Sequence, residues 1–380
     1  MKVLRGTSRE ENGTAAVGEA TADWDATPDV IIAFTSTARD PKKVAKALAH
    51  RWPDVPTIGC TTAGEHLDGA HENGSLVLIG IVDPLTRWAC AVADDVRSFG
   101  PAEAEASASA MFEALGVDRD ALDPAKLFCL CLLDGSSATE EGIASEMADA
   151  LDGVTMLGGS AGDDLAFATT WVFANGACYE HGAIFLMGKT ERSFRVLKHQ
   201  HMAADSSRPV VVTRADPATR RVFELDGYPA ATRYAEVLGV PRSELTSDRC
   251  FLRPTTVELD GESYIRSIRA IEDDDSLSFY CAIEEGMVLD IASPEKDQSV
   301  ALSDALEPLE PAELVIGFNC ILRSLEASKA EQHEALGAAL GRFSKHSIAF
   351  DTYGEQVNGL HMNQTLVAIA FDAAPEEVAA

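Results

Sequence analysis

The chain has 380 residues, of which 46% are hydrophobic and 24% charged, which is a globular composition with enough length for two domains. Its formal net charge is −30, from 61 acidic against 31 basic residues, and no basic stripe interrupts this excess. Binding to a nucleic-acid duplex or to an anionic membrane surface is therefore excluded as a main function, because both depend on clustered lysine and arginine.

The cysteines favour an intracellular location. All eight lack the CxxC spacing of zinc ribbons and redox motifs, and most lie in apolar runs such as 127–133. The first 25 residues contain no apolar segment typical of a signal peptide, and the longest apolar runs are only strand-sized. We therefore expect a cytoplasmic protein with reduced thiols and no bound metal.

The elements follow a recurring order along the chain. Residues 1–27 lack periodicity and are predicted to be a flexible leader. A buried strand at 30–34, a helix at 41–52, a strand that ends in the small-residue turn 59–65 and a strand at 75–81 then form a first copy. Pro41 suits the first turn of that helix, because its missing N–H would be unpaired there anyway.

Two further copies have the same order. The second has a strand at 126–133, a helix at 139–151, the glycine-rich turn 158–164, a hairpin at Asn175-Gly176 and a strand at 182–188. The third has a strand at 313–320, one long helix at 326–343, a strand and turn at 347–355, and a strand at 364–371. A β-rich stretch separates these two copies, with a domain boundary near 215–228. The end, 373–380, is predicted to be a flexible tail.

This pattern predicts an α/β fold of layered mixed β-sheets flanked by helices, built from repeated β-α-β-β units in two domains.

The glycine-rich turns are the first candidate for a binding site. Glycine lets the backbone approach a ligand and expose its N–H groups, and an acidic residue follows each turn. N–H donors beside carboxylates suit a zwitterion, which carries both charges. Alternatively, the glycines serve only to turn the chain. The residues of the two turns that we expect to bind a ligand are Gly59, Cys60, Thr61, Thr62, Glu65, Gly158, Gly159, Ser160, Asp163 and Asp164.

Polar residues near the C-terminus complete the predicted site. Asn319 and Arg323 follow a buried strand, where an arginine is either a carboxylate anchor or half of a structural ion pair with Glu355. Asn363 lies in the polar segment that follows His361. His361 itself is a pocket residue, a haem ligand or a structural histidine. The pair His199 and His201 could place two imidazoles on one face of a strand, although this spacing is commonly incidental.

Catalysis has weaker support in the sequence. Residues 158–162 match Gly-x-Ser-x-Gly, but the hydrolase elbow requires a helix directly after the serine, and apparent β structure follows Ser160. No phosphate-binding fingerprint occurs. A hydrolase that uses Ser160 or Cys60 as nucleophile remains an alternative, and we expect that the protein is not an enzyme.

Five segments in this order resemble FIST-domain proteins, whose name stands for F-box and intracellular signal transduction. They are 58–65, 158–164, 224–230, Gly317 to Arg323, and 353–365 with its Tyr-Gly-Glu and Asn-Gln-Thr runs. The resemblance covers about residues 28–372 and implies a FIST N-type domain over 28–222 and a FIST C-type domain over 223–372.

The resemblance also implies a function. It points to a bacterial, cytoplasmic sensor that binds a small polar ligand such as an amino acid without a cofactor. Because the chain has no room for an F-box or a kinase domain, it would act on a separate histidine kinase or cyclic-di-GMP enzyme. Some members resemble nitric-oxide sensors, so a haem-based gas sensor with His361 as the iron ligand is the second reading.

Overall fold

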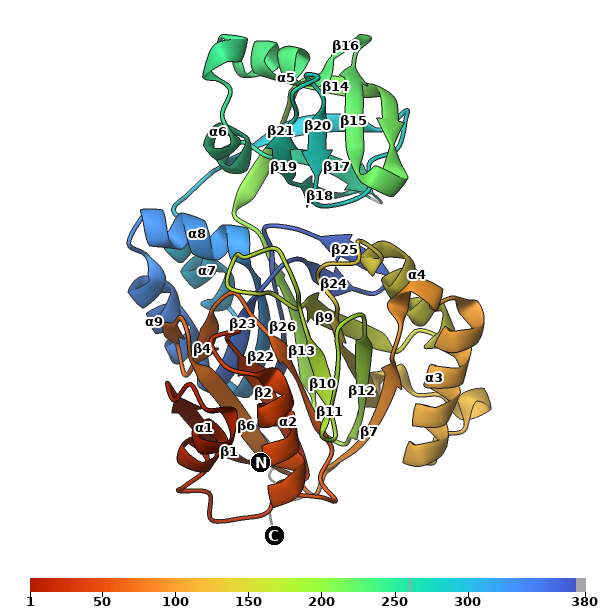
Figure 1. The fold of residues 1–380 in the computed structure, drawn as a ribbon, viewed down its shortest axis with the longest axis vertical. Helices are drawn as coiled ribbons and strands as arrows, with labels where there is room; N and C mark the ends of the chain where they lie inside the picture. Colours follow the sequence, from red (N-terminus) through yellow and green to blue (C-terminus); the bar gives the residue numbers. More distant parts are fainter. Residues whose placement is uncertain (260, 374–380) are drawn as a thin grey trace.

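The computed structural model describes residues 1–259 and 261–373, and the same order of elements occurs in it three times (Figure 1). Each repeat contains an outer strand, a helix, a buried strand, a further helix or two, a parallel strand, a short hairpin and a closing antiparallel strand. The third copy, which the sequence indicates by pattern alone, is therefore confirmed.

The elements of the first repeat are β1 (Lys2–Ser8), α1 (Gly13–Ala20), β2 (Val30–Thr35), α2 (Pro41–Arg51), β3 (Thr57–Thr61), β4 (Glu65–Leu67), β5 (Ala70–Glu72) and β6 (Leu76–Val82). Those of the second are β7 (Thr86–Ala93), α3 (Pro101–Leu115), β8 (Leu127–Leu133), α4 (Glu140–Ala150), β9 (Thr155–Ser160), β10 (Val172–Ala174), β11 (Ala177–Tyr179) and β12 (Ala183–Thr190). Those of the third are β13 (Phe194–His199), α7 (Gln298–Leu306), β22 (Ala312–Cys320), α8 (Ile321–Lys329), α9 (His333–Phe343), β23 (Ser344–Thr352), β24 (Glu355–Val357), β25 (Leu360–Met362) and β26 (Leu366–Phe371).

The three repeats exchange their hairpins. The hairpin β4–β5 pairs with β23, the hairpin β10–β11 with β3, and the hairpin β24–β25 with β9. Three six-stranded sheets result, in the orders β1-β6-β2-β3-β10-β11, β7-β12-β8-β9-β24-β25 and β13-β26-β22-β23-β4-β5. Because the exchange is cyclic, no sheet is complete without strands from another repeat.

One apolar core joins the three sheets. The central strands read as continuous apolar runs, which suits strands that are covered on both faces. Phe34 of the first repeat lies 4.5 Å from Phe350 of the third, measured between ring centroids, and Phe128 of the second lies 5.2 Å from Phe371. The helices cover the outer faces, with α2 begun by the predicted Pro41 and capped by Asp40.

A fourth sheet is inserted into the third repeat between β13 and α7. Its strands have the order β18-β17-β21-β14-β15-β20-β19, with β16 on β15, and Figure 1 shows it at the end of the molecule away from both termini. Its strands and helices are β14 (Met202–Asp216), β15 (Arg221–Leu225), β16 (Tyr228–Pro229), α5 (Ala230–Leu238), α6 (Ser247–Leu252), β17 (Thr255–Leu259), β18 (Glu262–Arg266), β19 (Ile268–Ile271), β20 (Leu277–Phe279) and β21 (Val288–Pro294).

Two expectations are wrong. The predicted flexible leader contains β1, which pairs with β6 over its whole length, and α1, whose Ala16 and Val17 are buried. Short side chains made this helix hard to recognise, since its apolar face is mostly alanine and glycine. The predicted long helix at 326–343 is two helices, α8 and α9, separated near Glu331, which has a φ of 54°.

The predicted division at 222/223 stays a prediction, and strand pairing does not follow it. Strands β4 and β24 pair across that limit with β23 and β9. From residue 374 onward, the predicted tail lies outside the described residues.

Candidate functional site

Three glycines of the two turns provide room for packing rather than for a ligand. A Cβ atom on Gly59 would lie 2.1 Å from the carbonyl oxygen of Ala33 and 2.2 Å from the ring of Phe173. On Gly158 it would lie 1.9 Å from the carbonyl oxygen of Cys131. On Gly159 a Cβ would lie 2.5 Å from the side-chain methyl group of Thr352, in the third repeat. These glycines therefore allow strands and sheets to approach closely.

Several main-chain donors of the turns, which we expected to be free for a ligand, already have partners in the protein. Thr61 donates to Trp171, Ser160 donates to Gly354, and Gly162 donates to Thr61, at 2.8, 2.8 and 2.9 Å. Cys60 is fully buried, and burial raises the pKa of its thiol well above the ordinary value. A buried thiol of this kind behaves as a small apolar side chain, not as a nucleophile.

Glu65 and Glu355 occupy equivalent places in the first and third repeats. Glu65 accepts hydrogen bonds from the hydroxyl of Thr62 and, at 2.8 Å, from both the main-chain N–H and the hydroxyl of Ser75. Glu355 accepts from Thr352 and Thr365 in the same pattern. Burial raises the pKa of each carboxyl to about 7. Glu355 is thus not the ion-pair partner of Arg323 that the sequence suggests.

The acidic residues of the second turn fix the loop that follows them. Asp163 accepts from the N–H groups of residues 167, 168 and 169 and from the Tyr353 hydroxyl. Asp164 accepts from Ser36 and Thr37 of the first repeat. Both carboxylates therefore bind protein groups.

Ser160 and Asn363 lie in a buried polar region around Gln356. Gln356 donates its amide to the Ser160 hydroxyl at 2.9 Å and contacts Nδ1 of His361 at 3.0 Å. Asn363 accepts from the Cys281 thiol at 2.9 Å. Ser160 is fully buried, and its side-chain partner is an amide rather than a base, which favours a packing role over nucleophilic attack.

Asn319 and Arg323 are placed differently, because they line a cavity. A hollow of about 40 Å³ is bounded by both residues, by His66 and His333, and by apolar side chains of α7 and α9. It adjoins a larger hollow of about 230 Å³, with which it shares His66, Leu302, Leu340 and other residues.

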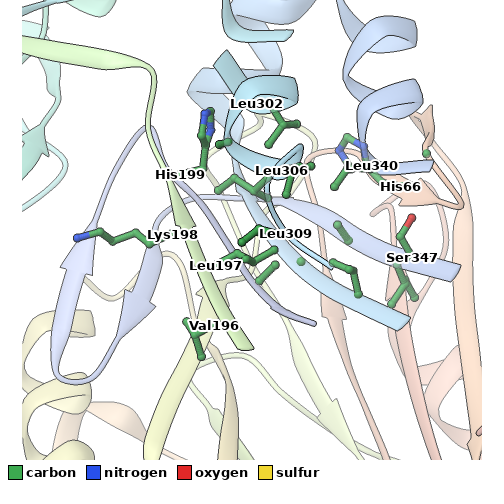
Figure 2. A pocket seen from close by; sticks show the side chains of 18 residues that line it. His66, Val196, Leu197, Lys198, His199, Leu302, Leu306, Leu309, Leu340 and Ser347 are labelled. Carbon is green, nitrogen blue, oxygen red and sulfur yellow. The ribbon is translucent and has the colours of Figure 1, made fainter. Parts of the chain in front are cut away.

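The larger hollow lies between the sheet of the third repeat and the helices above it. Figure 2 shows Leu302 and Leu306 of α7 and Leu340 of α9 on one side, and Val196 and Leu197 of β13 on another. Most of its lining is aliphatic, and its polar members include His66, Lys198, His199 and Ser347. The two hollows together form an apolar chamber with a polar end at Arg323.

Arg323 is the buried cation of this polar end. Its side chain is 1% exposed, its Nε donates to Asn319 at 3.1 Å, and its Nη1 lies 3.3 Å from Nδ1 of His201. His201 in turn contacts Glu326 at 2.8 Å. Burial lowers the pKa of Arg323 to about 10, against the opposing charges of Glu326 and other carboxylates, so the guanidinium is charged at neutral pH.

Five histidines gather around Arg323 and Asp351, which the sequence does not reveal. Of the predicted pair, His199 lines the larger hollow, where burial lowers its pKa to about 3, and His201 contacts Arg323. His66 and His71 contact the buried Asp351, and His333 stacks on His71. His66 and Asp351 are 285 positions apart, so only the fold unites them.

Two groups of side chains in the described part of the chain have the composition of metal ligands. One is His66, His71 and Asp351, and the other is Glu141, Cys281 and His361. The second group does not fit a haem with His361 as axial ligand. The His361 ring is 3% exposed, and a Cβ on Gly354 would lie 2.2 Å from it, so protein occupies the space that a porphyrin would need.

The fold and the cavity define an α/β protein of three interlocked repeats with a chamber of the size that a small molecule fills. The FIST N domain model matches residues 29–228, and the FIST C domain model matches residues 230–358. The chain belongs to the FIST family, whose domains are associated with sensors in signal transduction. No curated protein matches the chain. Among the described helices, none combines the length and apolar character of a membrane span.

Proposed function

We propose that this protein is a sensor that binds a small organic carboxylate with an apolar body, such as an apolar amino acid, in the chamber beneath α7 and α9. The observation that carries the proposal is Arg323. It is a buried guanidinium at the end of an apolar cavity, and no carboxylate among the described residues forms an ion pair with it.

The equivalent arginine of the first repeat shows what a purely structural role looks like. Arg39 is also buried, and it donates to the carbonyl oxygens of Glu10 and Gly74 and to the Thr35 hydroxyl. Arg323 has an asparagine oxygen and an imidazole nitrogen instead. A buried charge without an anionic partner is costly, whereas a ligand carboxylate would form strong charge-assisted hydrogen bonds with it.

The chamber restricts the rest of the ligand. Its larger part, about 230 Å³, is below the roughly 300–1,000 Å³ of sites that hold drug-sized molecules, so the ligand is small. Aliphatic lining from Leu302, Leu306 and Leu340 favours an apolar body. Of the residues that we predicted to bind the ligand, Asn319 and Arg323 line the chamber, and those of the glycine turns do not.

Calorimetry tests this proposal. Titrations compare apolar amino acids, the matching carboxylic acids without the amino group, and the matching uncharged amides. We expect heat from a carboxylate and none from its amide. Arg323→Met should abolish binding, and Ala349→Leu, which fills the wall shared by the two hollows, should weaken it.

Arg39→Met is the matched control, since it removes a buried arginine that does not line the chamber. It should lower stability and leave ligand affinity unchanged. Absence of heat with the whole panel, or full affinity in folded Arg323→Met, would refute the proposal.

Signalling through a separate partner is a further part of the proposal that rests on the family resemblance. A histidine kinase or a cyclic-di-GMP enzyme is the expected partner class. Activity of a candidate partner, measured with and without the ligand found by calorimetry, is the measurement that decides it.

A further inference from the structure

The first group of possible metal ligands lies where three strands meet. His66 is on β4, His71 is opposite it on β5, and Asp351 is on β23. Nε2 of His66 lies 2.8 Å from one oxygen of Asp351, and Nε2 of His71 lies 3.2 Å from the other. All three donor atoms lie within 4.8 Å of one another.

The architecture does not require these residue types. Each exchanged hairpin places a cross-strand pair beside the end of the strand that it joins, so the three repeats provide three equivalent sets. The sets are His66, His71 and Asp351; Gln356, His361 and Ser160; and Phe173, Cys178 and Thr61. Only the first consists entirely of metal-binding side chains, and the fold forms with the other two.

We propose that His66, His71 and Asp351 bind a divalent transition-metal ion of the Zn²⁺ class. Two neutral imidazoles and one carboxylate are ordinary ligands for such ions, and three protein ligands leave a position open for water or another molecule. In a tetrahedral site with bonds of about 2.0–2.2 Å, neighbouring ligand atoms are about 3.3–3.6 Å apart. The imidazole nitrogens approach different oxygens of Asp351, at 2.8 and 3.2 Å, and one donor atom from each of the three residues lies within 4.8 Å of the others, so small side-chain shifts would bring the three to this spacing.

The surroundings support a bound cation. Asn319 donates to Asp351 at 2.8 Å and so orients the carboxylate, as second-layer groups do in metal sites. The His333 ring stacks on His71, with 3.9 Å between the ring centroids, and so helps to fix the orientation of that imidazole. Arg323 bonds to Asn319, and no lysine or arginine among the described residues forms an ion pair with Asp351.

The site is also open enough for an ion to enter. The side chains of His66 and His71 are 17% and 11% exposed, whereas Asp351 is fully buried beneath them. Gly64 leaves room above the carboxylate, because a Cβ there would lie 2.4 Å from Asp351 and 3.1 Å from His71. The glycine corner of the first turn thus opens onto this cluster.

Titration of tag-free, chelator-treated protein with Zn²⁺ and Co²⁺ tests the site without any organic ligand, so it is independent of the function proposed above. We expect one ion per chain and a Co²⁺ visible spectrum of nitrogen and oxygen ligation without a thiolate charge-transfer band. Zn²⁺ should also raise the melting temperature.

The equivalent set of the third repeat supplies variants that suit the fold. His66→Gln and Asp351→Ser introduce the residues found there, and each should weaken Zn²⁺ binding by more than about 10–100-fold, since even second-layer changes reach that range. His50→Gln, on the exposed face of α2, is the matched control and should bind as the wild type does.

No binding by the wild type, a thiolate band, or full affinity in folded His66→Gln would overturn the assignment. His361→Gln distinguishes the second group, because loss of binding in that variant alone would move the metal to Glu141, Cys281 and His361. If Asp351→Ser does not fold, His66→Gln and the Co²⁺ spectrum still decide the question.

Discussion

Glu65 and Glu355 are buried carboxyl groups that the same Thr-x-Gly-Glu run holds in two repeats. In each, a threonine three residues earlier and a serine or threonine ten residues later donate to the carboxylate. These contacts bring the end of one strand, the start of the exchanged hairpin and the start of the closing strand together. The acidic residue is therefore a structural clamp at each of these two corners.

The raised pKa values of the clamps predict a pH dependence of stability. Burial raises each pKa from 4.5 to about 7, so between these values the folded state holds protons that the unfolded state has released. The free energy of unfolding should consequently fall as pH rises from about 4.5 to about 7, by on the order of 1–3 kcal/mol per carboxyl.

The double variant Glu65→Gln and Glu355→Gln should reduce this slope, because glutamine keeps an acceptor and a donor without titrating. Urea denaturation across the pH range measures it, with Glu113→Gln on the exposed face of α3 as the control. An unchanged slope in the double variant would show that neither carboxyl titrates in this window.

At the scale of elements, the exchanged hairpins determine how the helices sit. The tip of β4–β5 is Asp68-Gly69, with φ angles of 50° and 82°, which suits a two-residue hairpin turn. A Cβ on Gly69 would lie 2.6 Å from the carbonyl oxygen of Gly337, and a Cβ on Gly337 would lie 1.9 Å from that of Gly69. Helix α9 thus rests directly on the hairpin tip, beside the chamber.

Two glycine substitutions separate packing from backbone strain. Gly69→Ala and Gly74→Ala both place alanine at a positive φ, 82° and 75°, but only position 69 has protein within 4 Å. Both should lose about 1–2 kcal/mol for the left-handed conformation, and Gly69→Ala should lose a further ~1–3 kcal/mol from overpacking. Denaturant midpoints of the two variants give the comparison, and equal losses would mean that the contact between hairpin and α9 carries no free energy.

The sequence predicts elements well where the signal is local and fails where it is not. Asn175-Gly176, Pro41 and the apolar run 127–133 each indicate their element within a few residues, and the structure confirms all three. The glycine turns mislead because a side chain at Gly59 would collide with Phe173, and one at Gly159 would collide with Thr352. Both of these neighbours are distant in sequence. Local pattern cannot distinguish a glycine that admits a ligand from one that admits a neighbouring strand.

The candidate site depends still more on distant contacts. Asn319 and Arg323 could be predicted, because an arginine just beyond a buried strand has few roles. The remaining polar lining comes from several elements, among them β4 of the first repeat and β13, α9 and β23 of the third. Since β4 joins the third sheet only through the exchange of hairpins, no periodicity within one repeat indicates that His66 faces Asp351.

At the scale of the whole molecule, a buried ion-pair network links the inserted sheet to the second repeat, and separate contacts such as Gln364 to the Phe251 carbonyl oxygen link it to the third. Arg220, just before β15, forms ion pairs with Glu140 and Glu141 at the start of α4, and Glu141 also accepts from the N–H of Ala282 at 2.8 Å. Burial opposes the charge of Arg220, but the two glutamates outweigh it and raise its pKa further above the ordinary value. This network is therefore the main polar link between the second repeat and the insertion.

Arg220→Ala should loosen that link. The Glu140 side chain is 3% exposed, so removal of the guanidinium leaves a buried carboxylate unpaired, at a cost of roughly 3–5 kcal/mol. Hydrogen exchange should rise at the start of α4 and around Ala282, while the amides of β2, β8 and β22 keep their protection, because they lie in the shared apolar core.

Arg214→Ala is the matched control, since the Arg214–Glu224 pair lies within the insertion with 55% and 35% of the side chains exposed and is worth less than about 1 kcal/mol. Uniform loss of protection in Arg220→Ala would instead mean that the insertion and the repeats unfold together, with no separable interface between them.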